Sequence, residues 1–384
     1  MATAPQIGVL SPLFDVSFAE GGGAGGAAFA SVTSGGGTRG EEAVPLRVHA
    51  PGDRAVFQSR RFVAAAAGCT RIATVVGRLG AGGPGIRSRA GAFDCADDRL
   101  DDPRGDGYMF ERCDGLNYVV ERSSADGGRG TDVRVPQSSW NLDRLDGGGL
   151  SGLTFDASAV NAFLIVQEQV AGGAASVKMG VLARGSVTYV HRFDGSAART
   201  ASLPVRFELE CLEGGGGGAA EADAASASVS SSGGPPTGVR RSLGGRAAAR
   251  DVSISMTSCP ALSARLSASG ARATCRLSAL HLTCTSAAYY ELVRGGELEG
   301  AAWVPPPSGA SAEYDVSATA VSGGAVVTSG FASPGVTYDV SLKGEDVPPL
   351  TSDIAGLPEI YTLNVVCLMS SGLAWTSLDV EELR

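Results

Sequence analysis

Side chains able to carry out nucleophilic, acid–base or metal chemistry are scarce in this sequence of 384 residues. It holds three histidines, His49, His191 and His281, and the last two lie in alternating strand-like runs, where a histidine is usually solvent-facing or hydrogen-bonded. The Gly-x-Ser-x-Gly, Ser-x-x-Lys and His-Glu-x-x-His patterns are absent. The eight cysteines form no Cys-x-x-Cys pair, and no Cys/His cluster suggests zinc. We therefore expect no catalytic residue, no metal ion and no cofactor.

Two further stretches, a glycine motif and an acidic run, are candidates for ligand binding. Residues 80–85, Gly-Ala-Gly-Gly-Pro-Gly, fit the dinucleotide pattern Gly-x-Gly-x-x-Gly, which must open a helix whose N-terminus faces the pyrophosphate. Here Pro84 and the strand-like run 86–93 follow, so we interpret the match as coincidence. The six aspartates of 94–106 lack the spacing of a calcium loop and are interpreted as acidic turns, with a structural cation as the alternative. A hydrolase using two carboxylates brought together in space stays open as an alternative.

The elements that position these residues are short strand-like runs. β-Branched and aromatic residues recur in short pieces, with Gly, Asp or Pro between them at intervals of about 8–12 residues. Residues 176–190 illustrate the pattern, because 177–181 alternate, Arg184-Gly185 form a turn and 187–190 return. This texture predicts an all-β chain of two antiparallel β-sandwich, jelly-roll-like domains joined by a Gly/Ser-rich segment.

Two low-complexity segments suggest the domain boundaries. Residues 19–42 contain two glycine triplets, and residues 212–250 combine a glycine run, a Ser/Ala tract and Pro235-Pro236. Neither has the apolar periodicity needed to offset chain entropy. We expect a flexible N-terminal arm at 1–45, a β-sandwich domain at 46–211, a low-complexity linker or loop at 212–250 and a second β-sandwich domain at 251–384.

The bulk composition excludes several protein classes. The 55 glycines never keep a three-residue period, so the chain is not collagen-like. A net charge of -9 argues against direct nucleic-acid binding, which needs a basic face. No run approaches the ~18 apolar residues of a membrane span. Residues 1–10 lack the basic and apolar regions of a secretory signal, so we expect no export by that route.

A longer pattern spans the chain. The block Ser138-Ser139-Trp140-Asn141-Leu142-Asp143-Arg144-Leu145-Asp146-Gly147, followed by Leu-Ser-Gly-Leu-Thr-Phe-Asp at 150–156, resembles a stretch that recurs in structural proteins of large DNA viruses and tailed phages. Members continue with an apolar strand, a glycine hairpin, a His-x-Phe strand and a Leu-Pro-x-Arg-aromatic-Glu strand. These correspond to residues 163–166, 177–180, 191–193 and 203–208. Similar blocks lie in the same order upstream, at 91–94, 106–111 and 118–124, and downstream, at 313–319 and 323–331.

The resemblance implies a virion component, of minor capsid or of fibre or tail type, that acts by subunit packing rather than as an enzyme. The implied partners are other capsid or virion subunits, with a homo-oligomer expected and neither nucleic-acid binding nor a membrane span. The resemblance carries no catalytic residue to transfer. On physical grounds the motif residues are expected to form turns and core anchors. They are Trp140, Asn141, Asp143, Asp146, Gly147, Ser151, Gly152, Phe155, Asp156, Gly323 and Gly324.

A second functional hypothesis stays open beside the first. A receptor- or carbohydrate-binding β-sandwich at the virion surface would present exposed aromatic side chains as a platform. Trp303, Tyr289 and Tyr290 are the first candidates for that platform.

Overall fold

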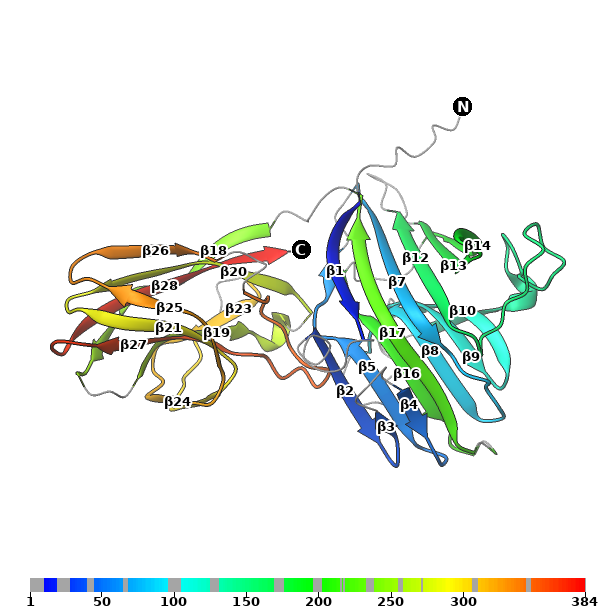
Figure 1. Ribbon diagram of the computed structural model, residues 1–384, viewed down its shortest axis with the longest axis horizontal. Helices are drawn as coiled ribbons and strands as arrows, with labels where there is room; N and C mark the ends of the chain where they lie inside the picture. Colours follow the sequence, from blue (N-terminus) through cyan, green and yellow to red (C-terminus); the bar gives the residue numbers. More distant parts are fainter. Residues whose placement is uncertain are drawn as a thin grey trace. The chain divides into compact units, whose positions relative to one another are not determined.

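The computed structural model describes residues 10–18, 28–39, 45–64, 68–95, 105–124, 131–168, 176–195, 202–214, 216, 218–232, 238–254, 258–270, 272–305, 310–342 and 347–383. The chain divides into two compact units, unit 1 (Met1–Pro236) and unit 2 (Thr237–Arg384). Both consist of antiparallel β-sheets, as Figure 1 shows, which confirms the predicted all-β sandwich class. Within the described ranges, no helix is long and apolar enough to cross a membrane.

Unit 1 packs two large sheets against each other. The eight-stranded sheet has the order β14-β13-β12-β7-β17-β4-β3, with β1 paired to β17. Its strands are β1 (Ser11–Ser17), β3 (Thr38–Arg39), β4 (Pro45–Val48), β7 (Thr70–Arg78), β12 (Asn161–Glu168), β13 (Ser176–Ala183), β14 (Ser186–Asp194) and β17 (Ala220–Ser231). The hairpin expected at 176–190 is confirmed, because β13 pairs with β14 across Arg184 and Gly185, both at positive φ.

The second large sheet of unit 1 is seven-stranded, in the order β11-β10-β9-β8-β16-β5-β2. Its strands are β2 (Phe29–Ser34), β5 (Arg54–Ser59), β8 (Ile86–Phe93), β9 (Gly107–Cys113), β10 (Leu116–Ser123), β11 (Thr131–Pro136) and β16 (Val205–Cys211), and a short pair, β6 (Val63–Ala64) with β15 (Ser202–Leu203), lies beside them. Because β8 follows the glycine motif at 80–85, the structure shows a strand where a dinucleotide site needs a helix.

The core of unit 1 lies between these two sheets. Side chains alternate along each strand, so Ala55 and Phe57 of β5 face the core, whereas Arg54 and Gln58 face the other side of the sheet. Aromatic rings dominate the packing, and Phe29 stacks on Phe57 with ring centroids 4.5 Å apart. Each such buried ring contributes roughly 1.5–3 kcal/mol to folding.

Unit 2 repeats the sandwich on a smaller scale. A four-stranded sheet, β18-β28-β20-β26, packs on a five-stranded sheet, β23-β19-β27-β21-β25. The bounds are β18 (Gly238–Val252), β19 (Cys259–Leu266), β20 (Thr274–Cys284), β21 (Ala288–Arg294), β23 (Ala312–Asp315), β25 (Ala325–Ala332), β26 (Thr337–Ser341), β27 (Tyr361–Cys367) and β28 (Gly372–Leu383), with a short pair of β22 (Glu297–Glu299) and β24 (Ala320–Ser322).

Two expectations about low-complexity segments are wrong. The linker expected at 212–250 contains β17, a strand inside the larger sheet of unit 1, and most of β18, an edge strand of unit 2. Alanine and serine suffice in β17 because it hydrogen-bonds to β7 on one side and to β1 and β4 on the other. The neighbouring backbone also approaches closely, since a Cβ on Gly77 would lie 2.2 Å from the Asp223 carbonyl oxygen.

The expected flexible arm at 1–45 is also structured in part. β1, β2 and β3 pair with β17, β5 and β4 respectively, and Phe18 and Phe29 are buried in the core. Residues 1–9, 19–27 and 40–44 of that segment lie outside the described residues. So do Asp97, Asp98, Asp101 and Asp102 of the acidic run, whereas Asp94 Oδ1 accepts a hydrogen bond from the backbone N–H of Asp106.

Candidate functional site

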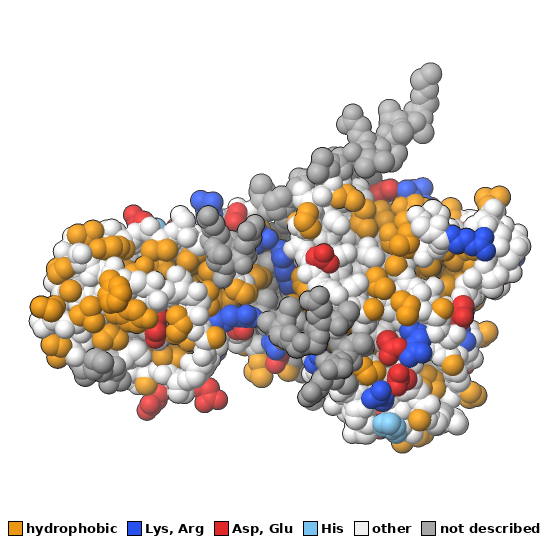
Figure 2. All heavy atoms as spheres, viewed as in Figure 1, with side chains coloured by type: hydrophobic (Ala, Val, Ile, Leu, Met, Phe, Trp, Pro, Cys, Tyr) orange, Lys and Arg blue, Asp and Glu red, His pale blue; other side chains and the backbone are white. Residues whose placement is uncertain are grey.

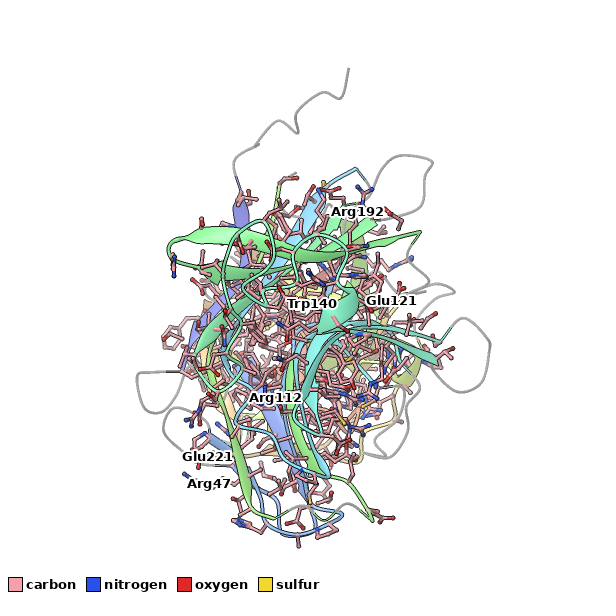
Figure 3. All side chains as sticks on the ribbon, turned by 90° about the vertical axis from the view of Figure 1, so that its right-hand side faces the viewer. Arg47, Arg112, Glu121, Trp140, Arg192 and Glu221 are labelled. Atoms are coloured by element: carbon pink, nitrogen blue, oxygen red, sulfur yellow. The ribbon has the colours of Figure 1, made fainter. Side chains whose placement is uncertain are left out.

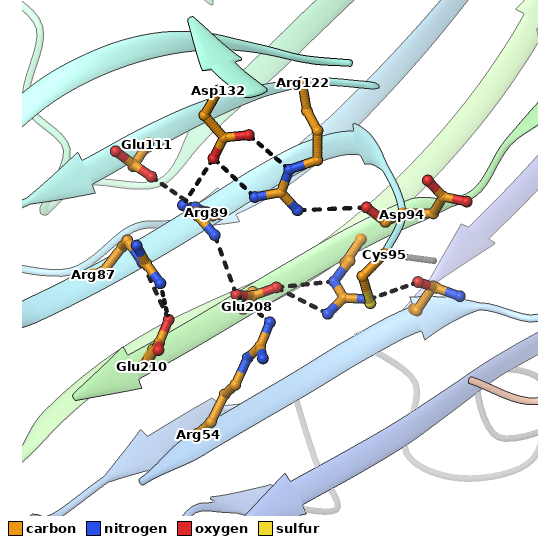
Figure 4. A network of polar contacts seen from close by, with 12 residues as sticks. Arg54, Arg87, Arg89, Asp94, Cys95, Glu111, Arg122, Asp132, Glu208 and Glu210 are labelled. Carbon is orange, nitrogen blue, oxygen red and sulfur yellow. Dashed lines mark hydrogen bonds and ion pairs between the residues drawn. The ribbon is translucent and has the colours of Figure 1, made fainter. Parts of the chain in front are cut away.

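A network of charged side chains covers one face of the seven-stranded sheet of unit 1 (Figure 4). Strand alternation puts Glu208 and Arg206 of β16 on the face opposite Phe207, which lies in the core. One Glu208 oxygen accepts from Arg54 at 2.8 Å and lies 3.5 Å from Arg89, and the other lies 3.0 Å from Arg206 Nε. Glu208 therefore joins three strands, β5, β8 and β16, through arginine.

The network extends across the remaining strands of the sheet. Arg89 also binds Glu111 of β9 at 2.6 Å, and Glu111 in turn accepts from Arg134 of β11 at 2.7 Å. Arg122 of β10 forms two hydrogen bonds to Asp132, at 2.8 and 2.9 Å. The guanidinium groups of Arg122 and Arg206 also lie 5.8 and 5.5 Å from the ring centroid of Phe93.

Burial makes this network electrostatically strong. Arg206 and Glu208 are both 1% exposed, and Arg89 is 4% exposed. Burial alone raises the pKa of the Glu208 carboxyl, but the charges of Arg54, Arg206 and Arg89 outweigh it and hold that pKa well below its usual range. Glu208 is thus a permanent carboxylate at neutral pH that orients arginines, and not a proton donor.

Unit 2 presents a different polar surface, on the outer face of its four-stranded sheet. In β28 the core residues Ala374, Leu378 and Val380 alternate with outward-facing positions that include Trp375, Ser377 and Asp379. Trp375 is 37% exposed and pairs in register with Thr283 of β20. Thr283 shares a 2.9 Å hydrogen bond with Thr337 of β26.

His281 occupies the centre of this face. Its Nδ1 lies 2.5 Å from Asp339 of β26, and its Nε2 lies 3.2 Å from Asp379 of β28. The hydrogen bond to Asp339 raises the pKa of His281 and outweighs the opposing effect of burial, and the hydrogen bond to Asp379 raises it further. His281 is paired with Ser377 in register, so it is a diagonal neighbour of Trp375. We call Trp375, Thr283, His281, Asp339 and Asp379 the Trp375 face.

The structure places most motif residues of the 138–156 block in one loop of unit 1, which is held by hydrogen bonds between side chains and backbone N–H groups. Asp143 is 5% exposed and accepts hydrogen bonds from the N–H groups of Leu145 and Ser151, each at 2.8 Å. Asp146 and Asp156 accept from the N–H groups two residues later, and Ser151 Oγ accepts from the N–H of Leu153. Gly147 and Gly152 have φ values of +82° and +62°, which favour glycine.

The aromatic and amide residues of the same block anchor that loop. Trp140 is 4% exposed, donates its Nε1–H to the Val135 carbonyl and lies 6.2 Å from the partly buried Phe155 (ring centroids). Asn141 exchanges two hydrogen bonds of 2.9 Å with the backbone of Arg192, and Figure 3 labels Trp140 and Arg192. In unit 2, Gly323 and Gly324 have φ values of +73° and +84° in the turn between β24 and β25.

The aromatic platform expected from Trp303, Tyr289 and Tyr290 does not assemble. Tyr290 is 7% exposed and packs in the core of unit 2. Tyr289 lies 5.4 Å from Phe331, which is 69% exposed on β25. Trp303 lies beneath the Arg265 guanidinium of β19, at 3.9 Å. Figure 2 shows further hydrophobic side chains gathered over unit 2.

Two features of the structure were missed from the sequence. Trp375 could have been found, because in 373–381 it falls in phase with Ser377, Asp379 and Glu381 rather than with the apolar positions. The sequence signal for the arginine network is weaker: charged and apolar residues alternate in Arg206-Phe207-Glu208-Leu209-Glu210. This alternation does not identify the partners, which lie on five other strands and cannot be matched without the sheet order. Among the residues the structure describes, no group of three or more His, Cys, Asp or Glu could hold a metal ion.

The solved structures that are similar to this chain are distant from it. No family model and no curated protein matches the sequence. An endo-β-1,4-glucuronan lyase from the fungus Trichoderma reesei is similar at 11% identity and a TM-score of 0.40, over 57% of this chain and 95% of that chain. A Bacillus licheniformis β-glucanase is similar at 12% identity and a TM-score of 0.35, over 56% of this chain and 96% of that chain. A legume lectin-like domain from Entamoeba histolytica is similar at 9% identity and a TM-score of 0.33, over 56% of this chain and 95% of that chain.

These similarities correct one expectation. The sequence interpretation held that the chain is not an enzyme, but structures named as a lyase, a glucanase and a glycosidic hydrolase are among its structural neighbours. That expectation is therefore withdrawn. With TM-scores of 0.40 and 0.35, these likenesses assign no activity to this chain.

Proposed function

We propose that the protein binds carbohydrate through the Trp375 face of unit 2. The observation that carries this proposal is the position of Trp375, a 37% exposed indole on the same outward sheet face as the Thr283 hydroxyl and the His281 imidazole. Large aromatic side chains are normally buried, so one that shares the outward face with hydroxyls and carboxylates points to a ligand with an apolar face and many polar groups. A sugar ring has both.

The charges of the Trp375 face favour an uncharged glycan. Asp339 and Asp379 lie on either side of His281, and each carboxylate retains an oxygen that can accept hydroxyl hydrogens. The face therefore carries no cationic excess of the kind that binds sulfate, phosphate or uronate groups. A glycan chain lying across the strands from Trp375 would meet polar side chains of β20 and then of β26, which follow β28 in the sheet.

A glycan array followed by calorimetric titration tests the proposal. Trp375→Ala removes the stacking surface and is expected to weaken binding of the selected glycan at least about tenfold, equivalent to about 1.4 kcal/mol. Trp303→Ala is the matched control, because Trp303 lies under Arg265 on the other sheet, and it is expected to bind as wild type. An array without hits, or unchanged binding by Trp375→Ala, would overturn the proposal. A loss confined to Trp303→Ala would move the site to the other sheet.

We also propose that the protein is a component of a virus particle, in contact with other virion subunits. The support is the sequence resemblance, whose blocks keep their order from 91–94 to 323–331. Mass spectrometry of purified particles, with soluble host protein as the control, is expected to show the chain enriched in the particles. Its absence from them would refute the location and leave carbohydrate binding to be judged by its own experiment.

A further inference from the structure

A pocket of about 410 Å³ opens in unit 1, where β7 ends and β17 begins. Its walls come from the loop 79–85 between β7 and β8, from Ser158, and from residues leading into β17. This volume lies within the roughly 300–1,000 Å³ of small-molecule sites. The lining includes Arg78, Gly83, Pro84, Ser158, Gly218 and Glu221.

The loop that forms one wall is held in place on its outer side. Arg112 Nε donates to the Ala81 carbonyl at 2.8 Å, and Asp114 Oδ1 accepts from the N–H of Gly85 at 2.7 Å. The N–H of Ile86 closes the turn on the Gly83 carbonyl at 3.0 Å. Because these bonds are made within the chain itself, the wall is preorganised and binding need not order it.

The glycines of the pocket fall into two groups. Gly80 has φ +87°, and a Cβ there would meet the Glu221 carbonyl oxygen at 2.3 Å, so the fold itself requires glycine. By contrast, a Cβ on Gly83 would approach only Ile86, at 4.0 Å, and one on Gly218 would have nothing within 4 Å. Neither has the positive φ that favours glycine. At Gly83 and Gly218, the missing side chain leaves space and bare peptide groups facing the pocket.

The charged groups of the pocket are balanced. Arg78 lies 3.2 Å from Glu221, and Glu221 also binds Arg47 at 2.7 Å; Figure 3 shows Arg47 and Glu221 side by side. The lining carries one cation and one anion, Arg78 and Glu221, together with the hydroxyl of Ser158. Phosphate sites use excess cations or a helix N-terminus, and a helix is not part of this lining. Exposed peptide groups and an ion pair are also poor partners for an apolar ligand.

We propose that this pocket binds a neutral polyhydroxylated molecule, a monosaccharide or disaccharide. Hydroxyl groups can donate to Glu221 and to backbone carbonyls and can accept from Arg78 and from backbone N–H groups. Pro84 and Ile86 supply apolar contacts for the carbon face of a sugar ring. The site lies in unit 1, so it is separate from the Trp375 face and does not depend on it.

Saturation-transfer NMR on the full chain, with a panel of neutral hexoses and disaccharides, supplies the first measurement. Inorganic phosphate serves as the charged counter-probe. At least one sugar is expected to bind, and phosphate is not. Binding of phosphate alone, or of no sugar, would overturn the proposal. A longer oligosaccharide of the same sugar is tested beside the small one. If the pocket takes the end of a glycan chain, both the small sugar and the oligosaccharide bind. If it takes a free small sugar, the oligosaccharide does not bind.

Variants then locate the binding. Gly83→Leu is expected to fill the pocket without backbone strain and to weaken sugar binding at least about tenfold. Gly148→Leu is the matched control in an exposed loop outside the lining, also without positive φ. Trp375→Ala is expected to leave this binding unchanged, which separates failure of this site from failure of the Trp375 face. Circular dichroism checks that each variant is folded. Unchanged binding by folded Gly83→Leu would refute the pocket.

Discussion

Glu208 shows how much a single carboxylate can stabilise when it is the shared partner of buried arginines. Glu208→Gln leaves Arg54, Arg89 and Arg206 without their common counter-charge, which costs about 3–5 kcal/mol in buried networks. Glu210→Gln on the same strand is the control, because Glu210 and its partner Arg87 are 21% and 26% exposed and such pairs contribute about 1 kcal/mol or less. Urea denaturation measures both. Similar small losses would show that Glu208 is not the centre of the network.

His281 predicts a pH dependence of stability in unit 2. Its pKa is raised in the folded state by Asp339 and Asp379, so its contribution is complete below the unfolded pKa of about 6.5 and is lost as pH rises through the higher folded pKa. Because Asp339 is 69% exposed, we expect a loss of about 1 kcal/mol at most as the pH rises above about 6.5. Urea denaturation across this range should show the slope in wild type and less of it in His281→Gln. Equal slopes would contradict the prediction.

Whether a strand could be predicted from the sequence depended on the size of its side chains. Val177–Val181 and the returning strand of the β13–β14 hairpin alternate large apolar residues with polar ones, and their pairing was predictable. In β17 small or apolar residues face inward and alternate with outward-facing serine and acidic residues; the inward residues are Ala222, Ala224, Ala227 and Val229. Because most of these side chains are small, the composition of the segment suggests low complexity instead of a strand. The arginine network and the Trp375 face could not be predicted from the sequence, because each joins strands that are distant in sequence. Local patterns do not specify which strands are neighbours in a sheet.

β17 offers a direct test of its assignment as a strand of the sheet. Val229→Asp would place a charge in the core of unit 1, where Val229 is 2% exposed, and is expected to cost more than about 3 kcal/mol. Ser228→Asp, one residue earlier, points to the opposite face, where Ser228 is only partly buried, and is expected to cost about 1 kcal/mol or less. Thermal denaturation compares the two. A low-complexity linker would tolerate both substitutions equally, and that result would contradict the strand.

Across the whole molecule, the basic residues are almost all arginine, since Lys178 and Lys343 are the two lysines among 31 basic residues. The buried sheet face of unit 1 depends on this choice. Arg89 contacts Glu111, Glu208 and Asp132 at once, and Arg206 contacts Glu208 and Gln58, which a planar group with five N–H donors can do. A lysine carries three donors on one atom and could not span these partners. The same composition that makes the sequence resemble low complexity therefore supplies the cross-strand connections of unit 1.

The division of the chain predicts which fragments fold. Residues 237–384 retain β18, which pairs along β28 from Gly238–Leu383 to Val252–Gly372 and contributes Leu243 to the core. Residues 251–384, the domain expected from composition, lose most of that strand and leave β28 as an unprotected edge. We expect the first fragment to unfold cooperatively with dispersed amide NMR signals, and the second to be unfolded or aggregated. Equal folding of both fragments would show that β18 is dispensable and that the compositional boundary at 250 is the better one.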